Sequence, residues 1–148
     1  LGAVRAGLHR LQRLLGSRGP WVALGEAAGV DLGQQEIQLL QVLHDGRARS
    51  IGDLARVARL DAAAASRRLR ALEERGMIAR RPSSVHGRIV MVEPTAEGLA
   101  CARRLHDLRD RHLVDALRRW DPSEREMLGR LMLRLVDDLE ATPYRSPA

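Results

Sequence analysis

The chain has 148 residues, of which 45% are hydrophobic and 2% aromatic, and its formal net charge is +6. This length predicts one ordinary domain, and the abundance of alanine and leucine favours a mainly α-helical fold. The single cysteine, Cys101, excludes a disulfide framework within the chain and a multi-cysteine metal site. No apolar run approaches the roughly 20 residues of a membrane span and no signal peptide is visible, so we expect a cytoplasmic protein without a membrane partner.

The first 31 residues predict two helices. Residues 1–15 place Val4 and several leucines at helical spacing, with arginines on the other sides. Glycines and Pro20 interrupt this helix, and residues 21–28 predict a shorter one that Gly29 ends. A further helix is expected over residues 32–43, with Ile37, Leu40 and Leu43 as its buried stripe.

Residues 51–58 and 61–75 predict two helices joined by a tight connection, which is the spacing of a helix-turn-helix. Ser50 and Asp61 are their candidate N-caps, and Gly76 is a typical C-terminal stop. The expected inward side chains are Ile51, Leu54, Val57, Ala65, Leu69 and Leu72.

A two-stranded hairpin is predicted directly after this motif. Residues 77–81 and the β-branched run 88–92 are the expected strands, and the turn-rich residues 82–87 form the tip. A hairpin in this position is a wing, so residues 32–94 predict a winged helix-turn-helix with its recognition helix at about 61–75 and its wing at about 77–92.

The last part, residues 95–148, predicts two longer helices. Thr95 caps the first, which is expected to run through Trp120 over roughly 38 Å and to reach a second subunit. Asp121, Pro122 and Glu124 form a strong start signal for the second, which is expected to end near Ala141. Apolar stripes on the first and last helices indicate dimerisation helices at both ends of the chain.

The positive charge is concentrated in the middle of the chain. All the basic residues are arginines; residues 47–88 hold 11 of them against 4 acids, whereas the remainder holds 14 against 15. A solvated surface would spread this charge out, so its concentration indicates a face for nucleic acid.

The chain resembles the multiple antibiotic resistance regulator (MarR) family from about Val4 to Ala141. Residues 65–78 look like that family's recognition helix and its exit into the wing, and Arg88, Val92, Thr95 and Gly98 stand where the family has its wing arginine and the start of its long helix. The chain departs from the pattern at three positions. His86 replaces an acid that helps to hold the wing arginine, Pro94 replaces a leucine, and Gly33 replaces a threonine.

Six residues are candidates for contacting DNA. The first residues of the recognition helix, Ala62 to Ala64, cannot hydrogen-bond through their side chains, so the arginines that follow are better placed. We expect Arg67 to read a base edge, Ser66 a base or a phosphate, and Arg68 a phosphate. The full set of candidates is Ser66, Arg67, Arg68, Arg70, His86 and Arg88, the last two reaching the minor groove from the wing.

The resemblance also implies partners. It implies a homodimer on a palindromic double-stranded DNA site, repression as the usual mode, and release by a small lipophilic or phenolic effector between the dimer helices and the DNA-binding lobe. Trp21, His44, His106 and His112 are candidate pocket residues, and no cofactor or metal is expected.

Three other classes of protein fit the sequence less well. An enzyme would need a constellation such as a phosphate loop or a His-x-x-x-His pair, and none is present. A metal- or oxidant-sensing winged-helix repressor would need clustered ligands or a reactive cysteine, and the isolated Cys101 is more typical of a buried small side chain. A winged helix that serves protein contacts alone is disfavoured by the basic segment.

Overall fold

The computed structural model describes residues 1–144, and the chain forms two compact units, residues 1–110 and 111–148. The fold is mainly helical with a small antiparallel sheet, as the sequence predicts. The division into dimerisation and DNA-binding regions at residues 1–31, 32–94 and 95–148 concerns their roles and stays a prediction. No helix in the described part of the chain is long and apolar enough to cross a membrane.

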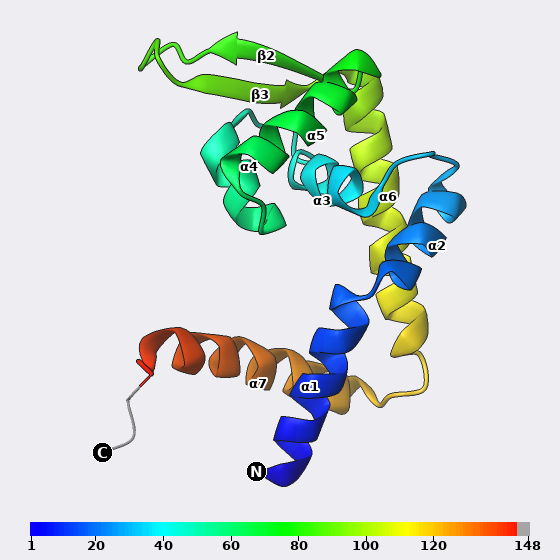
Figure 1. Ribbon diagram of the computed structural model, residues 1–148. Coiled ribbons are helices and arrows are strands. Elements are labelled where there is room, and N and C mark those ends of the chain that lie inside the picture. The colour runs from blue at the N-terminus through cyan, green and yellow to red at the C-terminus, as the bar shows by residue number, and fades with distance from the viewer. Residues whose placement is uncertain (145–148) are drawn as a thin grey trace. The chain divides into compact units, whose positions relative to one another are not determined.

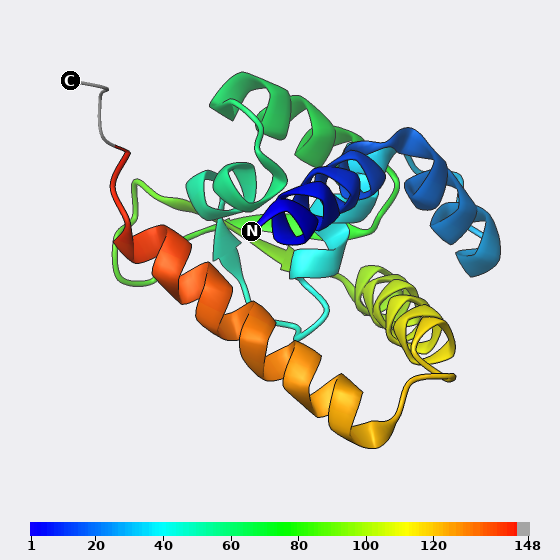
Figure 2. The same ribbon diagram turned by 90° about the horizontal axis from the view of Figure 1, so that it is seen from below.

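The first unit holds most of the elements in chain order. They are α1 (Gly2–Gly16), α2 (Arg18–Ala28), α3 (Gln34–Val42), β1 (Arg49–Ser50), α4 (Ile51–Ala58), α5 (Ala62–Glu74), β2 (Ile78–Pro82), β3 (Val90–Pro94) and most of α6 (Ala96–Ala116). Helix α3 lies in the middle of this unit, with α4 and α5 on one side and α2 and α6 on the other (Figure 1, Figure 2).

The core of the first unit is aliphatic and centres on α3. Ile37, Leu39, Leu40 and Leu43 are completely buried, and they pack with Leu54 of α4, Leu69 and Leu72 of α5, Val92 of β3 and Leu105 of α6. The inward positions expected on α5 are therefore confirmed. On α4 the expectation for Val57 is wrong, because Leu54 and Ala58 face the core and leave Val57 58% exposed.

Local signals set the ends of the two helices of the helix-turn-helix. The Ser50 hydroxyl accepts a hydrogen bond from the Asp53 amide at 3.0 Å, and Asp61 Oδ1 accepts one from the Ala64 amide at 2.7 Å. Gly76 follows α5 with φ of +70°, a conformation that glycine adopts without a steric penalty. Both N-cap predictions and the C-terminal stop are confirmed.

The sheet contains a strand that the sequence pattern does not predict. The order is β1-β3-β2, and β1 is only two residues long, pairing Arg49 with Val92 and Ser50 with Met91. Two residues are too few to show the alternation of a strand, so only the pairing with β3 reveals it. The returning strand begins at Val90 rather than Arg88, because the Ile89 amide closes a turn onto the His86 carbonyl at 2.8 Å.

Two other helix boundaries differ from expectation. Helix α2 begins at Arg18 rather than residue 21 and includes Pro20, which is tolerated because amides in the first turn have no partner within the helix. Helix α6 ends at Ala116 rather than Trp120, so its 21 residues span about 32 Å. Beyond it, the amides of Arg118 and Trp120 bond to carbonyls three residues back, which closes a tighter turn.

The second unit is dominated by α7 (Pro122–Ala141). The Asp121 amide donates to Glu124 Oε2 at 2.8 Å, and Asp121 Oδ1 accepts from the Ser123 amide at 2.9 Å. These contacts confirm the predicted start signal. No residue of α7 is buried within the chain.

Candidate nucleic-acid interface and the adjoining cavity

Helix α5 presents a basic face to solvent because its opposite face is fixed in the core. Ala65, Leu69 and Leu72 are completely buried, which turns Arg67 and Arg70 outward. Both arginines are exposed, and no acid of the described residues pairs with either. Two unpaired guanidinium groups one turn apart can bind phosphates or guanine edges.

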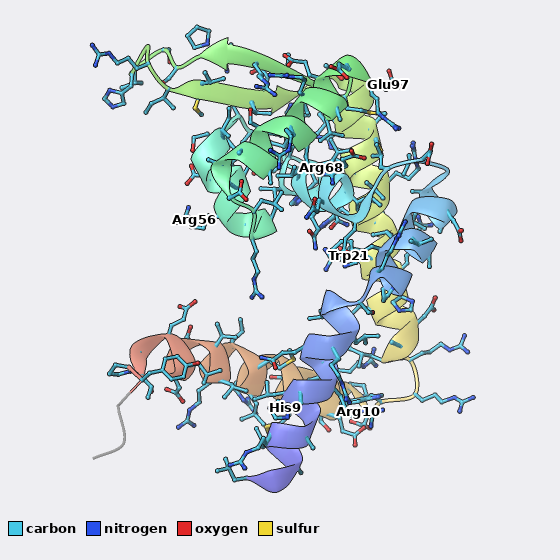
Figure 3. The ribbon with its side chains drawn as sticks, viewed as in Figure 1. His9, Arg10, Trp21, Arg56, Arg68 and Glu97 are labelled. Carbon is cyan, nitrogen blue, oxygen red and sulfur yellow. The ribbon has the colours of Figure 1, made fainter. Side chains whose placement is uncertain are left out.

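Arg68 lies on the flank of α5 that faces α3 (Figure 3). Its Nε donates a hydrogen bond to Gln35 Oε1 at 2.9 Å, and its Nη1 is 3.8 Å from Glu36 Oε1. The Glu36 side chain is only 9% exposed, so this arginine partly compensates a buried carboxylate. The predicted phosphate contact of Arg68 would therefore compete with these two interactions.

Ser66 is half-buried on α5, and its carbonyl is tied to the sheet. Arg80 of β2 donates from Nη2 to the Ser66 carbonyl at 3.2 Å, and its Nε is 3.2 Å from Glu73 Oε2. The next arginine, Arg81, pairs with Glu93 of the neighbouring strand at 2.7 Å. Arg80 therefore connects the sheet to α5, and Arg81 connects β2 to β3.

The tip of the wing carries His86 and Arg88, both exposed. The Ser83 hydroxyl accepts hydrogen bonds from the amides of Val85 and His86, at 3.3 and 3.2 Å, which shapes the tip. Within the described chain Arg88 has no acid partner. The position where the resemblance expects an acid holds His86, and Arg88 is left free to contact another molecule.

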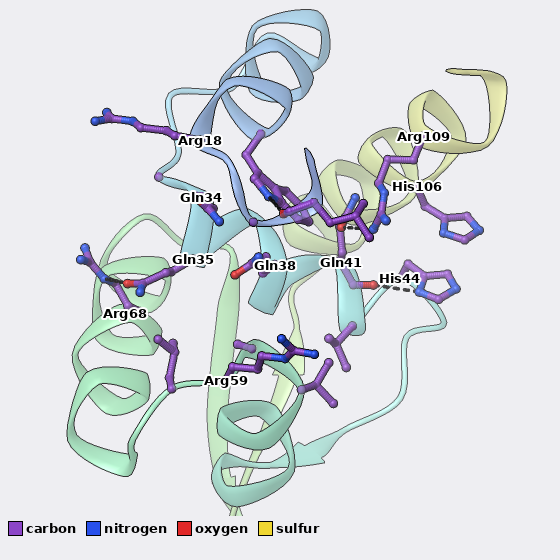
Figure 4. Close-up of a pocket in the computed structure, with 18 of the residues that line it drawn as sticks. Arg18, Gln34, Gln35, Gln38, Gln41, His44, Arg59, Arg68, His106 and Arg109 are labelled. Atoms are coloured by element: carbon purple, nitrogen blue, oxygen red, sulfur yellow. Dashed lines mark hydrogen bonds between the residues drawn. The ribbon is translucent and has the colours of Figure 1, made fainter. Parts of the chain in front are cut away.

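A cavity of about 1180 Å³ lies beside the helix-turn-helix in the first unit (Figure 4). The predicted pocket residues Trp21, His44 and His106 all line it, whereas His112 does not. The imidazole rings of His44 and His106 stack at 4.1 Å between centroids, with 11° between their planes. Residues from α2, from the segment after α3 and from α6 thus line one cavity. That they hold a ligand stays a prediction.

Arg109 joins Trp21 of α2 to the C-terminal turn of α3. Its guanidinium carbon is 5.4 Å from the centre of the Trp21 ring, a cation–π distance, and its Nη1 donates to Gln41 Oε1 at 2.7 Å. The backbone carbonyl oxygen of Gln41 also contacts His44 Nδ1 at 2.8 Å. Gln41 is therefore the residue through which α6, α3 and His44 are connected.

Comparison with known proteins shows which family this geometry resembles. Residues 30–89 match the family model described as the MarR family. Over these residues, which hold the helix-turn-helix and most of the wing, the chain is similar to the MarR family. The uncharacterized HTH-type transcriptional regulator YdgJ of Bacillus subtilis (strain 168) is 27% identical over 113 residues, which are 74% of this chain and 69% of that protein. The family resemblance drawn from the recognition helix and the wing is thereby confirmed.

Two solved structures share the fold over nearly the whole chain. FabT of Streptococcus pneumoniae in complex with DNA is 18% identical with a TM-score of 0.69, and the match covers 95% of each chain. NadR in complex with 4-hydroxyphenylacetate is 22% identical with a TM-score of 0.67, and the match covers 93% of this chain and 89% of that one. These likenesses show that the shared fold includes the helices on both sides of the wing and helix-turn-helix.

Sequence reasoning missed the polar character of this cavity. Five glutamines and four arginines line it, and no aspartate or glutamate does. Four of the glutamines, at positions 34, 35, 38 and 41, follow one another at helical spacing, and this pattern is the signal that could have located them. The arginines come from four separate segments, and only the tertiary structure brings them together.

Cys101 is buried on α6, with 2% of its surface exposed. Burial raises the pKa of its thiol, so the reactive thiolate is disfavoured, and this makes it a poor target for oxidants. Among the described residues, no group of three or more histidine, cysteine, aspartate or glutamate side chains is arranged to hold a metal ion.

Proposed function

We propose that this protein is a homodimeric transcriptional regulator that binds a palindromic DNA site and represses transcription until a small molecule releases it. The observation that carries the proposal is the pair Arg67 and Arg70, which are exposed and unpaired on the outer face of α5. It acts on DNA in the cytoplasm and has no catalytic role.

The DNA contacts follow from the placement of these arginines. A recognition helix in the major groove presents its exposed face to base edges, where an arginine can donate two hydrogen bonds to guanine O6 and N7. Arg67 is proposed to make such a contact, with Ser66 and Arg70 beside it. Arg88 at the wing tip is proposed to enter the minor groove, where narrow A·T-rich segments attract arginine.

Dimerisation is proposed from apolar surface that each helix leaves exposed. No residue of α1 or α7 is buried, although both carry large apolar side chains. The most exposed on α7 are Leu131, Leu133 and Leu139, at 51%, 70% and 58%. Exposed apolar helix faces of this kind mark protein interfaces, and a two-fold dimer matches a palindrome with half-sites about one DNA turn apart.

Release by an effector is proposed from the position of the cavity. Arg59, at the turn between α4 and α5, and Arg68, on α5 itself, both line it. A ligand that attracts these side chains therefore acts directly on the helix-turn-helix. NadR, which shares the fold, is solved with the phenolic acid 4-hydroxyphenylacetate.

The test is binding of the full chain to a duplex that carries the palindromic region upstream of its own gene, beside a random duplex of equal length. Titrations at two salt concentrations should show tight, salt-dependent binding, with a preference for the upstream site of about a thousandfold or more. Equal and weak binding to both duplexes would contradict the proposal.

A further inference from the structure

Two arginines on one flank of α5 bond to residues 31–36, which lead into α3 and form its first turn. Arg68 donates from Nε to Gln35 Oε1 at 2.9 Å (Figure 4). Arg75, seven residues later, donates to the backbone carbonyl oxygen of Asp31. Seven residues are about two helical turns, so both side chains leave α5 on the same side. The recognition helix is therefore attached to this segment at two points.

Glu36 is the fixed point of this attachment. Its side chain is 9% exposed, and its Oε2 accepts a hydrogen bond from the Gly33 amide at 2.8 Å. This hydrogen bond holds the carboxylate in place, with Oε1 at 3.8 Å from Arg68 Nη1. A carboxylate that is mostly buried is screened less by water and salt than an exposed one, so it attracts a guanidinium more strongly. Arg68 thus has a charged partner that cannot follow it toward DNA.

Arg68 differs in this respect from its neighbours on α5. Arg67 and Arg70 are exposed, and no acid of the described residues pairs with either. Arg68 directs its donors at α3 instead, although 50% of its side chain is exposed. A phosphate could recruit Arg68 only by breaking its contacts with Gln35 and Glu36, which would release one attachment of the recognition helix.

We propose that Arg68 is a positioning residue rather than a DNA contact, and that with Glu36 and Arg75 it clamps the recognition helix against the start of α3. The inference rests on the proposed function, because the clamp acts on DNA through the direction in which α5 presents Arg67 to a base. A helix that can tilt loses base-edge contacts, which need fixed geometry, before it loses phosphate contacts. The clamp therefore governs sequence preference more than overall affinity.

The substitution Glu36→Gln separates the two roles of Arg68 by the sign of its effect. Glutamine keeps an oxygen that can accept from the Gly33 amide, and it removes the negative charge. If Arg68 were a phosphate contact, loss of the competing acid would free it and strengthen binding to any duplex. A clamp predicts the opposite, namely weaker binding to the specific site and little change on random DNA.

The first measurement is fluorescence anisotropy over a series of salt concentrations, with the upstream palindromic duplex (the operator) and a random duplex. The full chain is compared with Glu36→Gln, Arg68→Ala and Arg68→Lys, each checked for folding by circular dichroism. Each variant should lower operator affinity at least about tenfold, change random-duplex affinity less than about threefold, and keep the salt slope of the wild type. Lysine keeps the charge that a phosphate needs, but its single ammonium group cannot hold Gln35 and Glu36 in the same geometry.

The second measurement contains no DNA and is hydrogen exchange of the full chain. Arg68→Ala and Glu36→Gln should each speed exchange in α5 and in residues 31–36 at least about threefold, and the double variant should exchange no faster than the faster single one. The matched control is Arg56→Ala, because this arginine pairs with Asp53 at 2.7 Å within one helix. It should change exchange in α5 and operator affinity less than about twofold.

Four results would overturn the proposal. They are stronger binding of Glu36→Gln to either duplex, wild-type operator affinity in Arg68→Lys, a salt slope lower by about 0.9 in Arg68→Ala, and unchanged exchange in α5. Failure of the proposed function is distinguishable, because the wild-type chain itself would then show no preference for the operator. In that case the exchange measurement alone decides whether the clamp exists.

Discussion

The carbonyl oxygen of Met77 lies so close to Gly98 that a β-carbon at position 98 would be 1.7 Å from it. This contact brings the first turn of α6 against the exit of α5. Thr95 reinforces it, because its hydroxyl donates to the Gly76 carbonyl at 2.6 Å and accepts from the Gly98 amide at 3.0 Å. The recognition helix and the long helix are thus joined through backbone contacts.

Gly98→Ala is expected to destabilise the protein by about 3 kcal/mol, because the new methyl group meets backbone that cannot move aside without shifting a helix. Urea unfolding followed by circular dichroism measures this loss. The control is Gly52→Ala in the first turn of α4, where the nearest atom is the Ser50 hydroxyl at 3.9 Å. It should gain up to about 1 kcal/mol from helix propensity. Equal stability of the two variants would contradict the close contact.

Arg67→Ala should weaken binding to the operator by about 1–3 kcal/mol and affect random DNA much less, if this side chain reads a base edge. Fluorescence anisotropy with both duplexes measures the difference. Arg81→Ala is the matched control, because this neighbouring arginine already pairs with Glu93 at 2.7 Å. A uniform loss on both duplexes would instead make Arg67 a phosphate contact.

Arg88→Ala should reduce operator affinity roughly tenfold, a loss of about 1.4 kcal/mol in binding free energy. It should also remove any preference for A·T-rich sequence beneath the wing. Competition between duplexes that differ only in those base pairs reports the preference. Val85→Ala, which trims a 79% exposed side chain at the same tip, should have little effect. Unchanged sequence preference in the Arg88 variant would remove the wing from the recognition mechanism.

Leu131→Arg should convert the proposed dimer to monomer, because a charge placed in an apolar helix interface is desolvated without a partner. Leu131 is 51% exposed within the single chain. Sedimentation equilibrium measures the mass, and Arg134→Ala on the same helix serves as the control. A Leu131 variant that remains dimeric would show that α7 associates through another face or not at all.

Cys101 gives a dependence of stability on pH. Burial raises the pKa of its thiol above the unfolded value, so the native state favours the protonated form. This contribution is complete below the unfolded pKa of about 8.5 and is lost as the pH rises above it. Between pH 7 and 9.5 the urea midpoint of the wild type should therefore fall more than that of Cys101→Ala. Equal falls would contradict a buried, protonated thiol.

Elements whose signals are local could be predicted from residue order alone. Apolar spacing on α5, the caps Ser50 and Asp61, the start signal at Asp121 and the positive φ of Gly76 all act within a few residues, so pattern was sufficient to identify them. The same holds for the basic segment and for the likeness to the MarR family, because both are properties of residue order.

Features that depend on residues distant in the chain could not be predicted in this way. The two-residue strand β1 exists only through β3, and Arg68 turns toward Gln35 and Glu36 because packing places α3 beside α5. The cavity gathers arginines from positions 18, 59, 68 and 109, a convergence that no spacing rule contains. Charges and hydrogen bonds act through space, so the chemistry of this cavity depends on distances between side chains that only the folded chain defines.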